Sequence, residues 1–167
     1  MQVMEAIQSR RSIRKYAPTP VEPEKLARIA EAFRLAPSAR NLQNWKLLII
    51  QTPEIRERVR SCCKSAPTFL QEAPVILVAC DSSQALMPCG HRVDSVDLSI
   101  AMSFAMLEAQ ELGLGTCWMG SFLEEPLRQA LQLPEGTSIA AITPLGYPAE
   151  SPDPRPRKPA EEVVAYL

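Results

Sequence analysis

The chain has 167 residues, a formal net charge of -1 and a sequence pI near 5.9. Apolar residues make up 46% of it and charged residues 22%, which indicates one globular domain over residues 1–167 with a sizeable core. The balanced charge argues against nucleic-acid binding, and no apolar run is long enough to span a membrane. The N-terminus lacks the pattern of a signal peptide, so we expect a cytoplasmic protein.

Helical patterns alternate with short apolar runs in the first half of the chain. Residues 2–9 have helical spacing, and a proline start with apolar residues at i, i+3, i+4 and i+7 predicts a second helix over 23–35. The apolar run 45–50 indicates a strand buried on both faces, followed by an exposed helix over 53–63. A second buried strand is predicted over 74–79, where proline is tolerated at the first position.

The second half of the chain holds the longest predicted helix, residues 94–112. Its centre is apolar on nearly all sides, which is typical of a helix buried inside a domain or between subunits. Strands are expected over 116–119 and 138–145, with a short helix over 124–131 between them. The proline-rich tail 144–159 cannot form a regular helix or a central strand, so we expect it to cross the surface or embrace a partner subunit. This alternation favours an α/β or α+β sandwich.

The five cysteines do not form a metal-binding or disulfide pattern. Their number is odd, and no Cys-x-x-Cys pair occurs. The single histidine, His91, lies two residues after Cys89, so a zinc site would need ligands scattered along the chain. We therefore expect reduced, mostly buried thiols, no metal, and a surface or packing role for His91.

Two basic clusters stand out in this nearly neutral chain. Four of the six residues from Arg10 to Lys15 are cationic, and Arg155, Arg157 and Lys158 form a second cluster near the other terminus. Arginine combined with a hydroxyl group binds phosphate well, because the planar guanidinium offers paired donors. If the clusters meet in space they make one anion site, and if they do not they are two solvated basic turns.

Four segments, in the same order along the chain, resemble the nitroreductase family of FMN-dependent flavoproteins. Residues 10–16 resemble the family's opening Arg-x-Ser-x-Arg/Lys signature, and 36–45 resemble its Ala-Pro-Ser-x-x-Asn-x-Gln-Pro-Trp segment. Residues 113–120 match the stretch under the flavin, and 144–148 with Arg155-x-Arg157 match the closing segment. The resemblance implies an α+β fold: a three-layer α/β/α sandwich with a mostly antiparallel sheet, built as an intertwined homodimer with FMN at the interface.

The resemblance also implies which residues bind the FMN phosphate. Arg10, Arg155 and Arg157 would hold the phosphate itself, which gives the two basic clusters a shared purpose. Arg11 and Ser12 would contact the ribityl–phosphate portion. No metal takes part in this expected site.

The flavin ring is expected to contact residues of both subunits. Arg14 would lie near the pyrimidine edge, where a fixed cation stabilises reduced flavin. A backbone N–H of Met119 or Gly120 would reach flavin N5, while a loop of the partner subunit would lie along the opposite edge and face. The residues expected around the ring are Arg14, Pro37, Ser38, Ala39, Asn41, Gln43, Cys117, Trp118, Met119 and Gly120.

Some positions depart from the family pattern or allow a plainer interpretation. Asn44 stands where the family has proline, which loosens the expected geometry of the neighbouring loop. Ser38 is equally explained as a turn residue, and Trp118 as a packing residue at a dimer surface. No clear equivalent of a mid-chain Asn or Lys that contacts the ring in larger relatives is present, and Lys64 and Arg92 are the candidates.

The implied function is an oxidoreductase in which FMN carries the chemistry, so no catalytic side chain is expected. NADH or NADPH would bind transiently, because no Gly-x-Gly-x-x-Gly fingerprint occurs, and a small electron-poor acceptor such as a nitroaromatic or quinone would follow in a ping-pong reaction. Larger members of the family insert helices that cover the active site at the place where this chain has only residues 81–92, which predicts an open site. Three alternatives stay open: a flavin carrier or sensor without efficient turnover, a dehalogenating or flavin-modifying branch, and a phosphate-binding domain without flavin.

Overall fold

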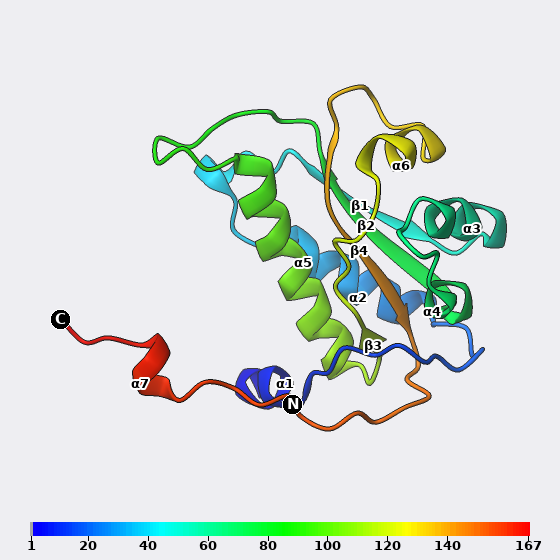
Figure 1. The fold of residues 1–167 in the computed structure, drawn as a ribbon, viewed down its shortest axis with the longest axis horizontal. Coiled ribbons are helices and arrows are strands. Elements are labelled where there is room, and N and C mark those ends of the chain that lie inside the picture. Colours follow the sequence, from blue (N-terminus) through cyan, green and yellow to red (C-terminus); the bar gives the residue numbers. More distant parts are fainter. Residues whose placement is uncertain (1) are drawn as a thin grey trace.

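The computed structural model describes residues 2–167 and has the expected α+β architecture. Its sheet contains four antiparallel strands in the order β1-β2-β4-β3, and helices cover both faces to give three layers (Figure 1). The strands are β1 (Trp45–Ile50), β2 (Val75–Asp81), β3 (Gly115–Thr116) and β4 (Ser138–Gly146).

Strand β2 shows why both faces of the sheet are covered. Its residues are all buried, and they alternate between two apolar clusters because successive strand side chains point to opposite faces. Leu77 and Ala79 pack under α2 (Pro23–Arg34) and α5 (Val93–Glu111), together with Phe33 and Leu98. An uninterrupted apolar strand therefore lies at the centre of the sandwich, as the sequence predicted.

Three short helices cover the opposite face of the sheet: α3 (Pro53–Ser61), α4 (Thr68–Glu72) and α6 (Glu124–Ala130). Each contributes one side chain that is fully buried beneath it, namely Val59, Leu70 and Leu127. Helix α3 is otherwise largely exposed, as expected. Helix α4 was not anticipated from the sequence, because five residues are too few to display a helical period.

Three expectations about strands are wrong. The start of the proline-rich tail does form part of a central strand, because β4 continues through Pro144 to Gly146 between β2 and β3. Strand β1 is not buried on both faces: it pairs only with β2, lies at the edge of the sheet, and is mostly half-buried. The strand expected over 116–119 ends at Thr116, and only Met119 returns to the ladder, where it pairs with Ile142. The chain leaves the sheet at Cys117, and Trp118, Gly120 and Ser121 in the segment that follows are exposed and can contact a ligand.

The N-terminal segment and the start of the C-terminal arm lie near each other at one end of α5 (Figure 1). Helix α1 (Val3–Ser9) packs against the C-terminal half of α5, where Gln110 donates to the Ser9 hydroxyl. After Pro148 the chain runs without regular structure to the short helix α7 (Ala160–Val163), and this C-terminal arm extends beyond the body of the domain. Among residues 2–167, no helix combines the length and apolar character needed to cross a membrane.

Candidate functional site

The two basic clusters meet in one groove. This groove of about 650 Å³ is lined by side chains from α1, from the segment after it and from the C-terminal arm. The basic and hydroxyl-bearing residues that line it are Arg10, Arg11, Ser12, Arg14, Arg155 and Arg157. Of the two interpretations left open by the sequence, one anion site or two solvated basic turns, this arrangement supports the single site.

Strand β3 holds the N-terminal side of the groove. The Ile13 N–H donates to the Thr116 carbonyl at 2.9 Å, and Ser12 forms a parallel bridge with Thr116. Ile13 is buried against Gly115, where an added Cβ would come within 2.7 Å of Ile13 Cγ1. Glycine is needed here because the Ile13 side chain packs directly against it, and this packing fixes the residues on either side of Ile13.

The start of the C-terminal arm pairs with the same N-terminal segment. The Arg14 N–H donates to Glu150 Oε1 at 2.5 Å, and the Ala149 N–H donates to the Lys15 carbonyl at 2.9 Å. Tyr16 is buried between the two segments and donates from its hydroxyl to the Ile13 carbonyl at 2.7 Å, and burial raises the pKa of Tyr16 well above its usual value. These contacts explain how arginines from opposite ends of the chain reach one groove.

The segment after β3 forms the third side of the site. Cys117 is buried beside Ser12, and burial raises the pKa of its thiol while the charge of Arg14 and the Ser12 hydroxyl act in the opposite direction. Two residues on, the Met119 N–H is already bonded to the Ile142 carbonyl at 2.9 Å. Of the two backbone donors expected to reach flavin N5, that of exposed Gly120 is therefore the one left for a ligand.

The segment 37–43 folds into a strained loop around the 3-10 turn η1 (Ala39–Asn41). Arg40, Asn41 and Gln43 all have left-handed backbone conformations, with φ of 53°, 57° and 52°. Such non-glycine residues cost of order 1–3 kcal/mol each, and they cluster at functional sites. The Gln43 N–H donates to the Ser38 hydroxyl at 3.2 Å, and its side-chain amide donates to the Asn41 carbonyl at 3.1 Å.

This loop lies far from the basic groove of its own chain. It contacts α5 near the N-terminal end, where the Ala39 N–H donates to both carboxylate oxygens of Asp97 at 3.2 and 3.0 Å. The groove lies near the other end, where α1 contacts Gln110. The 13 residues from Asp97 to Gln110 span about 20 Å at 1.5 Å per helical residue. One chain therefore assembles the expected flavin residues into two separate groups.

Comparison with known proteins decides the family. The model of the nitroreductase family matches residues 7–69 and 63–147 of the chain. The chain belongs to the nitroreductase family. A protein of Methanothermobacter thermautotrophicus with the provisional name NADH dehydrogenase/NAD(P)H nitroreductase is 38% identical, over 93% of this chain and 82% of its own. FMN reductase [NAD(P)H] of Bacillus subtilis is 30% identical, over 97% of this chain and 72% of its own.

Solved nitroreductase-family structures have the same fold. Nitroreductase A from Vibrio parahaemolyticus has a TM-score of 0.90 at 27% identity, over 99% of this chain and 76% of that one. An FMN-dependent nitroreductase from Clostridium difficile has a TM-score of 0.83 at 29% identity, over 98% of both chains. The expected fold class is thereby confirmed.

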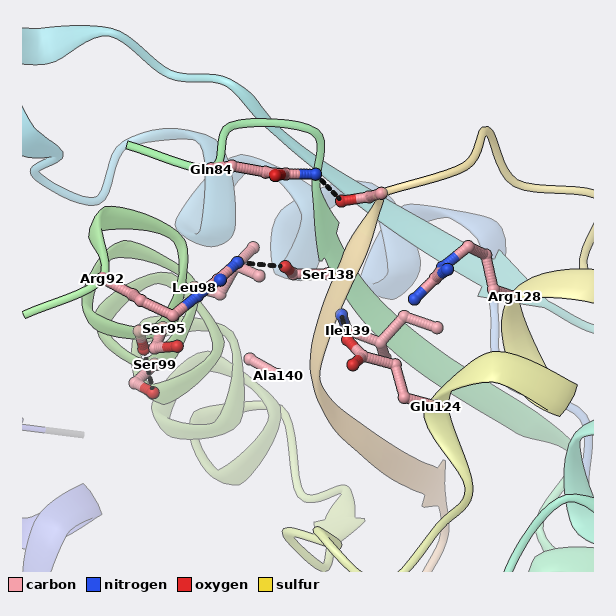
Figure 2. A pocket seen from close by; sticks show the side chains of 11 residues that line it. Gln84, Arg92, Ser95, Leu98, Ser99, Glu124, Arg128, Ser138, Ile139 and Ala140 are labelled. Carbon is pink, nitrogen blue, oxygen red and sulfur yellow. Dashed lines mark hydrogen bonds between the residues drawn. The ribbon is translucent and has the colours of Figure 1, made fainter. Parts of the chain in front are cut away.

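Lys64 and Arg92, the two candidates for a mid-chain contact, lie in different places. The Lys64 N–H donates to the Ser121 carbonyl at 3.0 Å, so Lys64 lies beside the exposed segment that follows Cys117. Arg92 instead lines a second pocket, of about 600 Å³, between α5, α6 and β4 (Figure 2). In this nitroreductase-family chain, Lys64 is therefore the candidate that the fold brings near the site.

The two arginines that line the second pocket, Arg92 and Arg128, are each paired with a carboxylate. Arg92 pairs with buried Asp94 and donates to the Ser138 hydroxyl at 2.8 Å, as Figure 2 shows for Ser138. Burial would raise the pKa of Asp94, but hydrogen bonds from Arg92, Ser138 and a backbone N–H hold it below its usual value. Arg128 pairs with Glu125 at 2.5 Å. The pocket therefore differs from the arginine-lined groove in having its cations already paired.

The thiols are as the sequence indicated: four cysteines are buried, Cys89 is exposed, and all five are free. Within residues 2–167 no three His, Cys, Asp or Glu side chains gather in a way that could hold a metal ion. Sequence reasoning missed Asp97, although a charged residue one position before an almost wholly apolar helical stretch is a usable signal of a buried polar contact.

Proposed function

We propose that this nitroreductase-family chain is an FMN-dependent oxidoreductase that takes electrons from NADH or NADPH and reduces a small electron-poor acceptor such as a nitroaromatic or a quinone. The observation that carries the proposal is the groove in which arginines from both ends of the chain meet beside β3. Relatives named FMN reductase and FMN-dependent nitroreductase support FMN as the cofactor.

The groove has the donor set that a phosphate monoester requires. Five arginines line it against a single carboxylate, that of Asp153. Arg10, Arg155 and Arg157 would hold the phosphate, with Arg11 and the Ser12 hydroxyl along the ribityl chain, because forked guanidinium donors bind phosphate oxygens in pairs. The residues present therefore fit the phosphate end of FMN.

The exposed segment after Cys117 fits the ring end of the same cofactor. FMN, when bound, supplies the hydride chemistry. Arg14 would place a fixed positive charge at the pyrimidine edge, which stabilises the reduced cofactor. The Gly120 N–H would donate to N5, since the Met119 N–H is bonded within the sheet. Cys117 and Trp118 would border the ring, and no titrating side chain is needed.

A homodimer would complete the site. Pro37, Ser38 and Ala39 lie about 20 Å along α5 from the groove of their own chain, so we assign them, with Asn41 and Gln43 as support, to the flavin held by the partner subunit. The chain also exposes apolar side chains of the kind found at protein interfaces. Val3 on α1 is 73% exposed, Phe104 on α5 is 42% exposed, and an apolar groove of about 480 Å³ lies between these helices.

The short segment 81–92 supports an open site that accepts varied molecules. It forms only a small hairpin, in which Leu86 bridges Arg92 and the Met87 N–H donates to the His91 carbonyl at 2.8 Å. Leu86 is 66% exposed. With so little cover, a nicotinamide donor and then an acceptor can reach the same face in turn.

The test is a visible absorption spectrum of the purified protein with FMN, before and after anaerobic addition of NADH or NADPH. A flavin spectrum that bleaches with either nucleotide is the expected result. Bound flavin that stays oxidised would point to a carrier or sensor. Protein that binds no FMN at any concentration would contradict the proposal and leave a phosphate-binding domain.

A further inference from the structure

We infer that Asp97 is a positioning residue: its carboxylate fixes the loop 37–43 in the conformation in which the loop meets the flavin of the partner subunit. The inference rests on the proposed function and adds to it a residue that does not itself touch the cofactor. It begins from the contact between Asp97 and the backbone of Ala39.

The contact is a buried, two-oxygen clamp on a single N–H. Asp97 is 4% exposed and lies on α5, the longest helix and a main element of one core. Both of its carboxylate oxygens accept from the Ala39 N–H, at 3.2 and 3.0 Å. A charged acceptor in a buried place makes this a strong hydrogen bond, and the helix makes it a rigid one.

The loop has little else to hold it. In the described chain, the other hydrogen bonds of residues 37–43 stay within the segment, from Asn41 and Gln43 to Ser38 and from Leu42 to Ala39. Leu42 is 51% exposed, so it does not anchor the loop by packing.

The same loop carries three left-handed non-glycine residues, Arg40, Asn41 and Gln43. Such conformations persist only where the surroundings enforce them. Ala36 and Trp45 hold the two ends of the loop against the core, and the Asp97 contact is the hydrogen bond that ties its middle to α5. Without that contact the loop should relax, and the surface offered to the partner's flavin should be lost.

Two independent changes remove the contact. Asp97→Ala deletes the acceptor. Ala39→Pro deletes the donor and should keep the backbone conformation. Ala39 is the first residue of a helical turn, where proline is favoured, and Ser38 before it is extended, with φ of -134° and ψ of 159°, as a residue before proline prefers. Each change should raise the FMN dissociation constant about tenfold or more, the usual effect of losing a hydrogen bond to a charged group.

The double variant distinguishes this role from general damage. If Asp97 acts through the Ala39 N–H, Asp97→Ala combined with Ala39→Pro should bind FMN no more weakly than either single variant. Asp97→Asn, whose amide oxygen can still accept, should recover most of the affinity. Effects of the two changes that multiply, or an Asp97→Ala protein with wild-type affinity, would overturn the inference.

Asp94→Asn is the matched control, since Asp94 is a buried carboxylate one turn earlier on α5 that pairs with Arg92 and not with the loop. It should lower the unfolding temperature of the FMN-free protein and leave the FMN dissociation constant within about twofold of wild type. The inference would also be overturned if Asp94→Asn weakened FMN binding as much as Asp97→Ala does. Failure of the wild-type protein to bind FMN would instead contradict the proposed function, so the two failures are distinguishable.

Discussion

The two ends of α5 hold their functional segments in different ways. At the C-terminal end, the segment from Arg10 to Tyr16 is fastened on one side to β3 and on the other to residues 147–150, with Ile13 buried between. At the N-terminal end, the strained loop 37–43 is tied to the domain through Asp97. The proposed phosphate site is thus held within one chain by contacts on two sides, while the loop assigned to the partner's cofactor is held to α5 by one strong contact.

The largest effect is expected from removing two arginines of the groove. Arg10→Ala combined with Arg155→Ala should raise the FMN dissociation constant about a hundredfold or more, because each loses a charge-assisted hydrogen bond to phosphate. Fluorescence titration of FMN measures it. Arg34→Ala is the control, since Arg34 is exposed on α2 and pairs with Glu31, and it should bind FMN normally. Equal affinity of the double variant and the control would show that the groove is not the phosphate site.

Mixed dimers test whether the two ends of α5 serve different flavins. A chain with both Arg10→Ala and Arg155→Ala and a chain with Ser38→Trp should each have little activity as homodimers at an FMN concentration that just saturates the wild type. Purified by two different tags, the mixed dimer should have about half of wild-type turnover, because one of its two interface sites combines an intact groove with an intact loop.

If instead each chain built its own site, both sites of the mixed dimer would be damaged. NAD(P)H oxidation by the mixed dimer would then stay at the level of the two homodimers. This outcome would contradict the assignment of the loop to the partner.

A smaller effect is expected where β3 meets the basic segment. Gly115→Ala would place a Cβ against Ile13 and should destabilise the fold by about 1–3 kcal/mol, the usual cost of overpacking, as measured by urea unfolding. FMN affinity should fall as well, since Ser12 and Arg14 flank Ile13. Adding Ile13→Ala removes Cγ1 and Cγ2, two of the three crowding atoms, so the double variant should lose less than the sum of the two single losses. Strict additivity would argue against the close contact.

The smallest effect concerns the acidic end of α5. Burial raises the pKa of Asp81, and the charges of Asp94 and Asp97 raise it further, while a hydrogen bond from Ser83 acts in the opposite direction. The pKa of Asp81 in the folded protein therefore lies above its unfolded value of about 3.9. The charged carboxylate destabilises the fold at pH values above about 3.9 and has no effect on stability below that pH. Asp81→Asn should therefore raise the unfolding temperature at pH 7 by about 2 °C, and the difference should vanish by about pH 4. A difference that grew toward low pH would contradict this assignment.

Elements with a long or uninterrupted apolar pattern could be predicted from the sequence. The bounds of α2 and α5 agree with the predictions within one residue, and β2 was predicted with its burial, because local patterns determine these elements. The edge position of β1 could not be read from its residues, since an apolar strand looks the same whether or not a further strand covers it. Helix α4 was too short to show a period.

The candidate site was predictable as a set of residues but not as an arrangement. Motifs identified Arg10, Ser12 and Arg155, yet whether the clusters meet depended on a pairing between residues more than a hundred positions apart. Ser38, Asn41 and Gln43 were identified too, but the left-handed backbone of Arg40 and Gln43 has no signal in side chains that usually avoid it. Asp97 was overlooked because a contact with a backbone N–H leaves no motif, and its place beside an apolar helical stretch indicates a buried polar contact without naming the partner.

The pairing between the Arg14 N–H and Glu150 joins residues 136 positions apart. During synthesis, the first arginines leave the ribosome long before Arg155 and Arg157 exist, and domains fold as their chain emerges. Strand β4, which pairs with both β2 and β3, is also made late, so the sheet and the groove are both completed only by the last thirty residues. Under the proposed function, cofactor capture has to wait for the end of the chain, because a chain truncated before Glu150 lacks Arg155 and Arg157.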